Sequence, residues 1–220
     1  PNTSYNSPFT NRYASESMRY IWSDHNRLIN WRKLWLFLLD CQRELGIDVG
    51  VSKEELEEIM SSVDDIDTVD IERIEKVLKH DVVSAMQEFS NKFPEIAEHI
   101  HKGATSQFIV DNSDSVCIRD SCMVLLVKAA KVVSILGRLA EENKDLPIVG
   151  MTHLQSAQPV TLGKRFAMWA SDFASAIESI SFDLDRMKIR SIKGTTGSMN
   201  SYLEIFGGDS SKVRELEKKI

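Results

Sequence analysis

Apolar residues recur along most of this chain at steps of three and four positions, which is the spacing of one face of an α-helix. Runs of alternating β-branched residues bounded by turn signals are absent, so we expect no strand. The pattern therefore predicts an all-α fold.

The two longest helical patterns cover residues 113–143 and 162–187. Their apolar positions are Ile118, Cys122, Leu125, Ala129, Val133, Leu136 and Ala140, followed by Leu162, Phe166, Trp169, Phe173, Ile177, Ile180, Leu184 and Met187. At about 1.5 Å of rise per residue, each helix is roughly 40 Å long. Alanines and serines fill the other faces of the second helix, so neighbouring helices can approach it on several sides. We expect a bundle whose remaining helices come from later sequence or from other subunits.

Shorter helical patterns precede these two. Residues up to about Ser23 are expected to form an irregular arm, and Asp24 begins a helix that Gly46 terminates. Its predicted apolar face consists of Leu28, Trp31, Leu34, Trp35, Leu38 and Leu39. Ser52 and Glu55 have the spacing of a capping box. Two helical pieces flank residues 79–81, a short one follows Pro94, and residues 210–220 resemble the start of another. All four tryptophans (Trp22, Trp31, Trp35 and Trp169) are expected in the core.

Composition narrows the possible functions. The formal net charge is −6, so a broad basic field for nucleic acid is absent, although local basic clusters can still hold a phosphate. The three cysteines (Cys41, Cys117 and Cys122) are an odd number without Cys-x-x-Cys spacing, which argues against a disulfide framework and fits a reduced cytoplasmic compartment. The longest apolar runs fall far below the roughly 18 residues that span a bilayer, so we expect no membrane segment.

Four polar segments interrupt the helical pattern: "NRYAS" at 11–15, "KHD" at 79–81, "HKGATSQFIVDN" at 101–112 and "MTHLQSAQPVTLGKR" at 151–165. Each has a simple structural interpretation when taken alone. Asp81 suits a helix N-cap, "GATS" suits a turn with a hydroxyl cap, and His153 suits a loop. "KGTTGS" at 193–198 first suggests a helix-terminating turn.

Taken together, the polar segments favour acid–base chemistry on a polyanion. Gly103 permits close backbone approach, Thr105 and Ser106 supply hydroxyl donors, and histidines titrate near neutrality. The cations available to an anionic substrate are Arg12, Lys79, Lys164 and Arg165. His99 and His101 stand two positions apart and would point to different sides of a helix, so we expect no metal site.

In their order and separation these segments, with "WRKLWL" and "SYLEIFGGD", resemble the adenylosuccinate lyases of the eukaryotic type, in the fumarase and aspartase superfamily. The resemblance implies β-elimination of fumarate from adenylosuccinate, giving AMP, and from a succinyl-carboxamide ribotide in purine synthesis, without a cofactor. It also implies a homotetramer with active sites shared between subunits. Residues 1–110 would form an N-terminal helical domain. Residues 111–220 would form the first part of the central bundle domain, with the rest of the protein missing.

The resemblance also implies roles for individual residues. His153 corresponds to the acid that protonates the departing nitrogen, and His80 lies near the reacting centre. Thr105 and Ser106 correspond to binders of the succinyl group. The other implied substrate-binding residues are Arg12, Tyr13, Lys79, Asp81 and Thr152. The family's base is a serine in an "SSxMPxKxN" loop that this sequence lacks, so we expect the stretch alone to be inactive.

The sequence departs from the family pattern at a few positions. Lys79 replaces an arginine, Ser156 replaces a proline, and "TGSMN" replaces "TGTQA". Lysine keeps the charge but loses the planar fork that grips a phosphate, so phosphate affinity is expected to differ. Two alternatives stay open: another fumarate-releasing lyase of the superfamily, and a noncatalytic helical scaffold.

Overall fold

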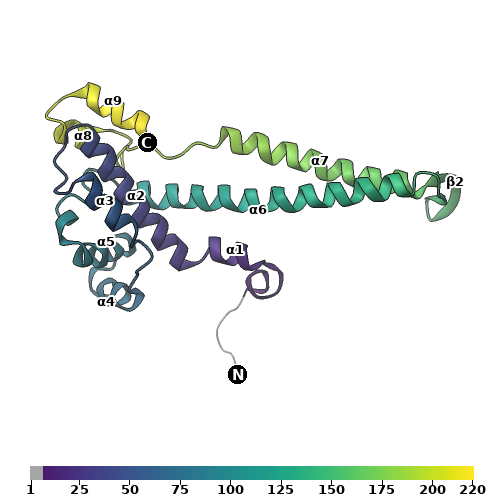
Figure 1. Ribbon diagram of the computed structural model, residues 1–220, viewed down its shortest axis with the longest axis horizontal. Helices are drawn as coiled ribbons and strands as arrows, with labels where there is room; N and C mark the ends of the chain where they lie inside the picture. The colour runs from purple at the N-terminus through teal and green to yellow at the C-terminus, as the bar shows by residue number, and fades with distance from the viewer. Residues whose placement is uncertain (1–6) are drawn as a thin grey trace. The chain divides into compact units, whose positions relative to one another are not determined.

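A computed structural model describes residues 7–220 of the chain (Figure 1). The first six positions of the predicted irregular arm lie outside the described residues. The elements are a π-helix at Phe9–Tyr13, α1 Glu16–Ile21, α2 Asp24–Glu44, α3 Lys53–Met60, α4 Thr68–Leu78, α5 Asp81–Lys92, a 3₁₀-helix at Pro94–Ile96, α6 Ser106–Glu142, β1 Pro147–Thr152, β2 Gln155–Thr161, α7 Leu162–Arg186, α8 Asn200–Ile205 and α9 Ser210–Lys219. The predicted all-α class is confirmed in its main feature, with one small hairpin added.

The chain forms two compact units. The first unit comprises residues up to Cys117 together with Ile189–Ile220, and the second comprises Ile118–Lys188. The predicted division into 1–110 and 111–220 concerns the domains of a longer protein and stays a prediction. None of the described helices is long and apolar enough to cross a membrane.

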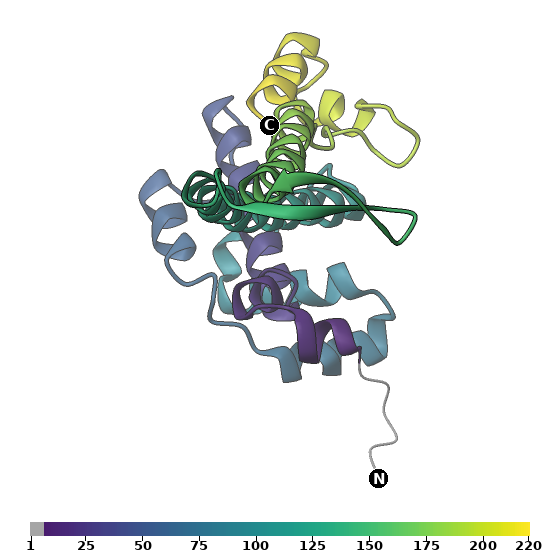
Figure 2. The same ribbon diagram turned by 90° about the vertical axis from the view of Figure 1, so that its right-hand side faces the viewer.

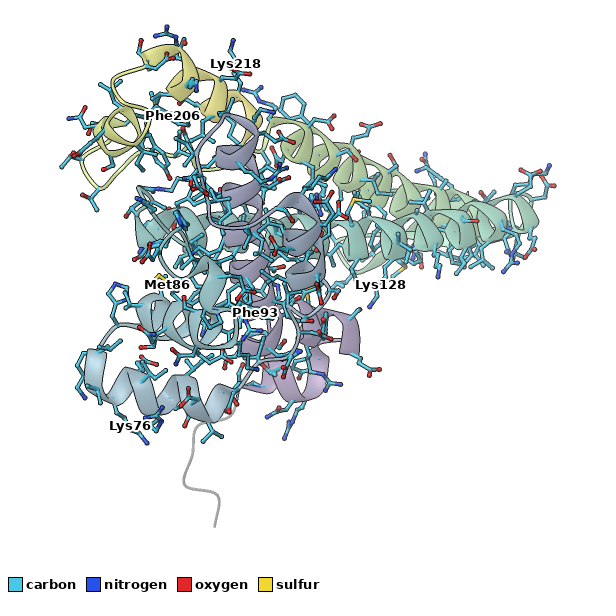
Figure 3. The ribbon with its side chains drawn as sticks, turned by 60° about the vertical axis from the view of Figure 1, so that its left-hand side comes forward. Lys76, Met86, Phe93, Lys128, Phe206 and Lys218 are labelled. Carbon is cyan, nitrogen blue, oxygen red and sulfur yellow. The ribbon has the colours of Figure 1, made fainter. Side chains whose placement is uncertain are left out.

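The first unit is organised around α2. Trp31, Trp35 and Leu38 are buried there, as the helical spacing predicted, and Trp35 stacks on Phe89 of α5. Phe93 and Phe206, both labelled in Figure 3, also contact this core. The predicted C-cap is confirmed by Gly46, whose φ of +86° suits glycine. The capping box of Ser52 and Glu55 is likewise present.

The prediction of an irregular arm up to Ser23 is wrong for its described part. That segment contains the π-helix and α1, because the Ser15 side chain accepts a hydrogen bond from the Met18 N–H and caps α1. The α6 helix also begins earlier than predicted, at Ser106. Phe108 and Ile109 are fully buried in its first turns, so core packing supports the extension.

In the second unit a hairpin of β1 and β2 connects α6 to α7 (Figures 1 and 2). The expectation that no strand occurs is therefore wrong. The two strands pair antiparallel from Pro147 opposite Thr161 to Thr152 opposite Gln155, with a bulge between Val149 and Met151. Most of their side chains are exposed, and Pro159 and Gly150 interrupt the residue pattern. Because the hairpin has no buried face, its sequence lacks the alternation of apolar and polar residues that predicts a strand.

The prediction that all four tryptophans lie in the core is wrong for two of them. Trp22 and Trp169 are each about half exposed, at 52% and 51%. Trp22 follows the short α1 helix, and Trp169 lies on α7, where Gly163 is the one residue described as buried. The second unit has only two helices, so it cannot cover every apolar position that the helical spacing marks.

Candidate functional site

The "KHD" segment forms the junction of α4 and α5 in the first unit. Lys79 ends α4 in a left-handed conformation, with φ 56° and ψ 34°. His80 is the N-cap of α5, and its Nδ1 accepts a hydrogen bond from the Val83 N–H at 3.4 Å. The structural interpretation that made Asp81 the cap is wrong by one residue, because Asp81 is already helical. All three side chains are exposed and can be reached by a ligand.

Asp81 carries a negative charge next to His80. Its Oδ1 accepts a hydrogen bond from the Val82 N–H at 2.7 Å and lies 3.4 Å from Nδ1 of His80. A protonated His80 would form an ion pair with this carboxylate. The carboxylate also sits in the first turn of α5, where the helix dipole favours a negative charge.

The "HKGATS" segment lies in the same unit. His101 is partly buried and has a φ of +66°, and its Nδ1 accepts a hydrogen bond from the Trp35 indole N–H at 3.1 Å. Burial lowers the pKa of His101 most, and the positive potential of His80 lowers it further. The structure thus brings the "KHD" and "HKGATS" segments within electrostatic range of each other.

Sequence reasoning considered His101 only as a metal ligand and missed this contact. The sequence feature that could have marked His101 as a site residue is its position two residues before Gly103, in a segment that already contained predicted site residues. Since Nδ1 is the acceptor, the neutral imidazole carries its proton on Nε2 and remains a hydrogen-bond donor there.

Gly103 lies against α8, where only a residue without a side chain fits easily. Its φ is +79°, and a Cβ there would meet Cδ1 of Ile205 at 2.7 Å and Cε1 of Tyr202 at 3.1 Å. The turn before Thr105 and Ser106 therefore rests on α8, and a Cβ at Gly103 would require Ile205 and Tyr202 to shift. Both are partly buried at the start of α6.

Two other residues of the same motif have a structural task. Asn112 brackets the backbone of Arg190: its Nδ2 donates to the carbonyl oxygen at 3.0 Å, and its Oδ1 accepts from the N–H at 2.7 Å. Asp111 forms an ion pair with the Arg190 guanidinium at 2.7 Å. Together they tie the start of α6 to the segment that returns from α7.

Arg12 and Tyr13 lie in the π-helix with exposed side chains. The rings of Tyr13 and Phe9 are 6.4 Å apart. Among the described residues, no hydrogen bond or ion pair connects Arg12 or Tyr13 to His80, His101 or Thr105. Their assignment to the substrate rests on the family resemblance.

Thr152 and His153 belong to the second unit, at the tip of the hairpin. Thr152 pairs with Gln155, so His153 and Leu154 form a two-residue loop, and their φ angles are +48° and +62°. Positive φ at both central positions defines a type I′ turn, which usually contains Asn and Gly. Leu154 is 95% exposed, and the His153 side chain is open to solvent.

The other polar residues of these segments have mainly local roles in this chain. Gln155 closes the hairpin turn, and the backbone N–H of Lys164 donates to the Thr161 side chain that caps α7. The "KGTTGS" segment is a turn, in which the Gly194 N–H donates to the Ser198 carbonyl oxygen at 2.8 Å. No described group of three His, Cys, Asp or Glu side chains has the geometry of a metal site.

Comparison with known proteins agrees with these motifs. The model of a protein family described as Lyase matches residues 48–205. Adenylosuccinate lyase of Saccharomyces cerevisiae is 37% identical over 218 residues, which are 98% of this chain and 45% of that protein. The adenylosuccinate lyase of Caenorhabditis briggsae is 37% identical over 217 residues, with the same coverage of 98% and 45%. The chain thus spans about half the length of the curated relatives it matches.

Solved structures share the fold. β-Carboxy-cis,cis-muconate cycloisomerase from Acinetobacter calcoaceticus sp. ADP1 has a TM-score of 0.79 at 20% identity, covering 97% of this chain and 50% of that one. Fumarate lyase from Mesorhizobium sp. BNC1 also has a TM-score of 0.79, at 24% identity, covering 98% and 49%. At these identities the likeness establishes architecture and leaves the chemistry open.

Proposed function

The chain belongs to the lyase family that its residues 48–205 match, and from this premise we propose that it is the N-terminal part of an adenylosuccinate lyase. The reaction is elimination of fumarate from adenylosuccinate to give AMP, and the same elimination from a succinyl-carboxamide ribotide. Relatives with the name adenylosuccinate lyase that align with nearly the whole chain support this choice.

The single observation that carries the proposal is the conformation of the His153–Leu154 turn. Non-glycine residues in the left-handed region cost free energy, and such positions cluster at functional sites. A two-residue turn of this type normally contains Asn and Gly. Here it presents an exposed imidazole, which is what an acid that must reach a substrate requires.

In the proposed mechanism, a base takes the proton from the carbon next to the one that bears nitrogen. The electrons of that C–H bond form the double bond of fumarate while the C–N bond breaks, and the nitrogen keeps the bonding pair. His153 donates a proton to this nitrogen. The base is the serine of the family's "SSxMPxKxN" loop, which is not in this sequence, so we propose that the isolated chain has no turnover.

The first unit would hold the rest of the substrate. Thr105 and Ser106 donate hydroxyl hydrogen bonds to the succinyl carboxylates, where charge develops during proton removal. Lys79 and Arg12 bind the nucleotide phosphate, Tyr13 and Asp81 bind remaining polar groups, and His80 lies beside the reacting centre. Thr152 of the second unit, next to His153, also binds the substrate. The neutral His101, which donates from Nε2, is added to this set from its contact with Trp35.

We further propose a cytoplasmic homotetramer in which different subunits contribute parts of each site. Support comes from exposed apolar residues on α6 and α7 of the second unit, including Leu125, Ile135, Phe173 and Phe182. Apolar faces of this length are normally covered in an assembled protein. The free state of all three cysteines agrees with a reducing compartment.

The proposal is tested with the longer protein that contains this chain. Absorbance assays offer adenylosuccinate, argininosuccinate and fumarate, and we expect turnover of the first. His153→Ala should lower kcat by about a hundredfold or more, the effect expected of a general acid. His25→Ala, which alters an exposed histidine of α2, is the matched control and should leave kcat unchanged. Preference for either of the other two substrates rejects the substrate assignment, and near-normal kcat in His153→Ala rejects the acid.

A further inference from the structure

A pocket of about 400 Å³ lies in the second unit, where the hairpin meets the start of α7. It is lined by Gly150, Met151, Val160, Lys164, Arg165, Met168 and Trp169. The volume falls in the range of small-molecule sites. Both charged residues in the lining are cations, in a chain whose net charge is −6.

The two cations are placed where the helix itself disfavours them. Lys164 and Arg165 stand at the N-terminal end of α7, and its first turn holds no acidic residue. The positive end of a helix dipole favours Asp or Glu, and each of α3, α4 and α5 has an acid in its first turn. Among the described residues, neither Lys164 nor Arg165 has an ion-pair partner. An anion bound here would relieve this unfavourable arrangement.

The rest of the lining suits a flat apolar group. Met168 lies four residues after Lys164, and Trp169 lies four after Arg165, so the four residues occupy one helix face. Long side chains on a helix lean toward its N-terminus, which directs Met168 and Trp169 toward the two cations. Trp169 is 51% exposed and Met151, on the facing strand, is 54% exposed. The Trp169 ring packs against Phe166, with the centroids 5.7 Å apart, and the half of the side chain that stays exposed lies next to two cations. This combination suits an aromatic ring that bears an anionic group.

The hairpin lines one side of the pocket, and a β-bulge at Gly150 determines which of its side chains face the pocket. At Gly150 the backbone approaches the carbonyl oxygen of Gln158 so closely that no Cβ would fit. The register shifts at this point, between Val149 and Met151. Bulges commonly re-aim side chains beside functional sites, and this one places Met151 in the pocket two residues before His153.

We propose that this pocket is a second ligand site, which binds a small aromatic anion with its phosphate or carboxylate on Lys164 and Arg165 and its ring against Trp169. The site lies wholly within the second unit, and it does not depend on the proposed lyase activity. Its ligand would contact the strand that leads to the hairpin turn.

The test uses the 220-residue chain, ¹⁵N-labelled, with phenyl phosphate as the probe. The indole N–H signal of Trp169, assigned by its loss in Trp169→Phe, should shift in a saturable manner. Lys164→Ala with Arg165→Ala should weaken binding by about tenfold or more, as expected when charge-assisted hydrogen bonds are lost. Both side chains are exposed and lie at the N-terminus of α7, which disfavours cations, so the thermal midpoint of the double variant should not fall. Lys76→Ala, which removes an exposed cation of α4 in the first unit, should leave the affinity unchanged.

Two comparison ligands complete the experiment. Phenol lacks the charge and inorganic phosphate lacks the ring, and each should bind more weakly than phenyl phosphate. Added salt should weaken phenyl phosphate binding, because exposed charges are screened. The proposal is overturned if no saturable shift occurs, if phenol binds equally well, or if the double variant binds as tightly as the original chain. None of these results depends on whether the longer protein cleaves adenylosuccinate.

Discussion

The indole N–H of Trp35 donates a hydrogen bond to Nδ1 of His101 at 3.1 Å. This bond joins the core of α2 to the segment that carries Thr105 and Ser106. It requires a lone pair on Nδ1, so it favours the neutral imidazole, in the same direction as the burial that lowers the pKa of His101.

The lowered pKa of His101 predicts that stability falls in mild acid. The unfolded chain takes up a proton on this histidine near its ordinary pKa of about 6.5, whereas the folded chain does so only at lower pH. Between these values the unfolded state binds more protons. The contribution of neutral His101 to the free energy of unfolding is therefore complete above about pH 6.5 and declines below it. Urea unfolding across this range should show the decline.

His101→Asn tests the assignment, because Asn tolerates the positive φ of 66° but does not titrate. We expect a shallower decline in this variant than in the original chain. His25→Asn, on the exposed side of α2, should leave the decline as it was. An unchanged slope in His101→Asn would show that other groups cause the acid sensitivity.

A second prediction concerns the buried ion pair of Arg32 and Glu88. Both side chains are 2% exposed, and Arg32 also donates to the carbonyl oxygens of Val63 and Asp65. The other oxygen of Glu88 accepts from the Asp67 N–H at 3.1 Å, so the pair fixes the segment between α3 and α4 to α5. Glu88→Ala leaves an uncompensated buried cation and should cost about 3–5 kcal/mol in urea unfolding.

The control for this pair is Glu57→Gln, which breaks the exposed contact of Lys53 and Glu57 on α3. It should cost at most about 1 kcal/mol. Arg32→Met combined with Glu88→Leu replaces both charges with apolar groups and should recover most of the stability lost in Glu88→Ala. A double variant as unstable as the single one would show that the hydrogen bonds to Val63 and Asp65 matter more than the charges.

The helices were predictable because each buries one face, and burial leaves a repeating pattern. The Ser52 capping box and the Gly46 cap were predictable because their chemistry is local. The hairpin was not, since its strands bury no common face and its turn contains His153 and Leu154 in place of Asn and Gly. The contact between Trp35 and His101 joins residues 66 positions apart, and no local pattern encodes such a pair.

A third prediction separates stability from binding at Lys79. Its left-handed conformation, with φ 56°, costs a residue other than glycine about 1–2 kcal/mol. Lys79→Gly should therefore raise the thermal midpoint of the chain. In the longer protein it should raise KM for adenylosuccinate, because a cation proposed to hold the phosphate is lost.

Lys79→Arg gives the opposite test at the same position. Its planar fork can bind a phosphate through two hydrogen bonds, so KM should fall relative to the original protein. The strained backbone is kept, so the thermal midpoint should stay near that of the original chain. If KM is unchanged in both variants, Lys79 does not contact the phosphate.

The last prediction uses two glycines of the second unit. A Cβ on Gly163 would collide with the carbonyl oxygen of Ala140 and would lie 2.7 Å from Cα and 2.8 Å from N of Lys144. All three are backbone atoms, so no side chain can rotate to make room. Gly163→Ala must push α7 away from the end of α6 and weaken the bond from the Gly163 N–H to the Asn143 carbonyl oxygen, now 2.9 Å. We expect a loss of about 1–3 kcal/mol in the free energy of unfolding, measured in urea.

Gly137→Ala is the matched control, since Gly137 lies within α6 and a Cβ there would meet no atom within 4 Å. Alanine there should raise stability by about 0.5–1 kcal/mol, because glycine loses more backbone entropy in a helix. Equal stability of the two variants would mean that α6 and α7 do not approach so closely at Gly163 in solution.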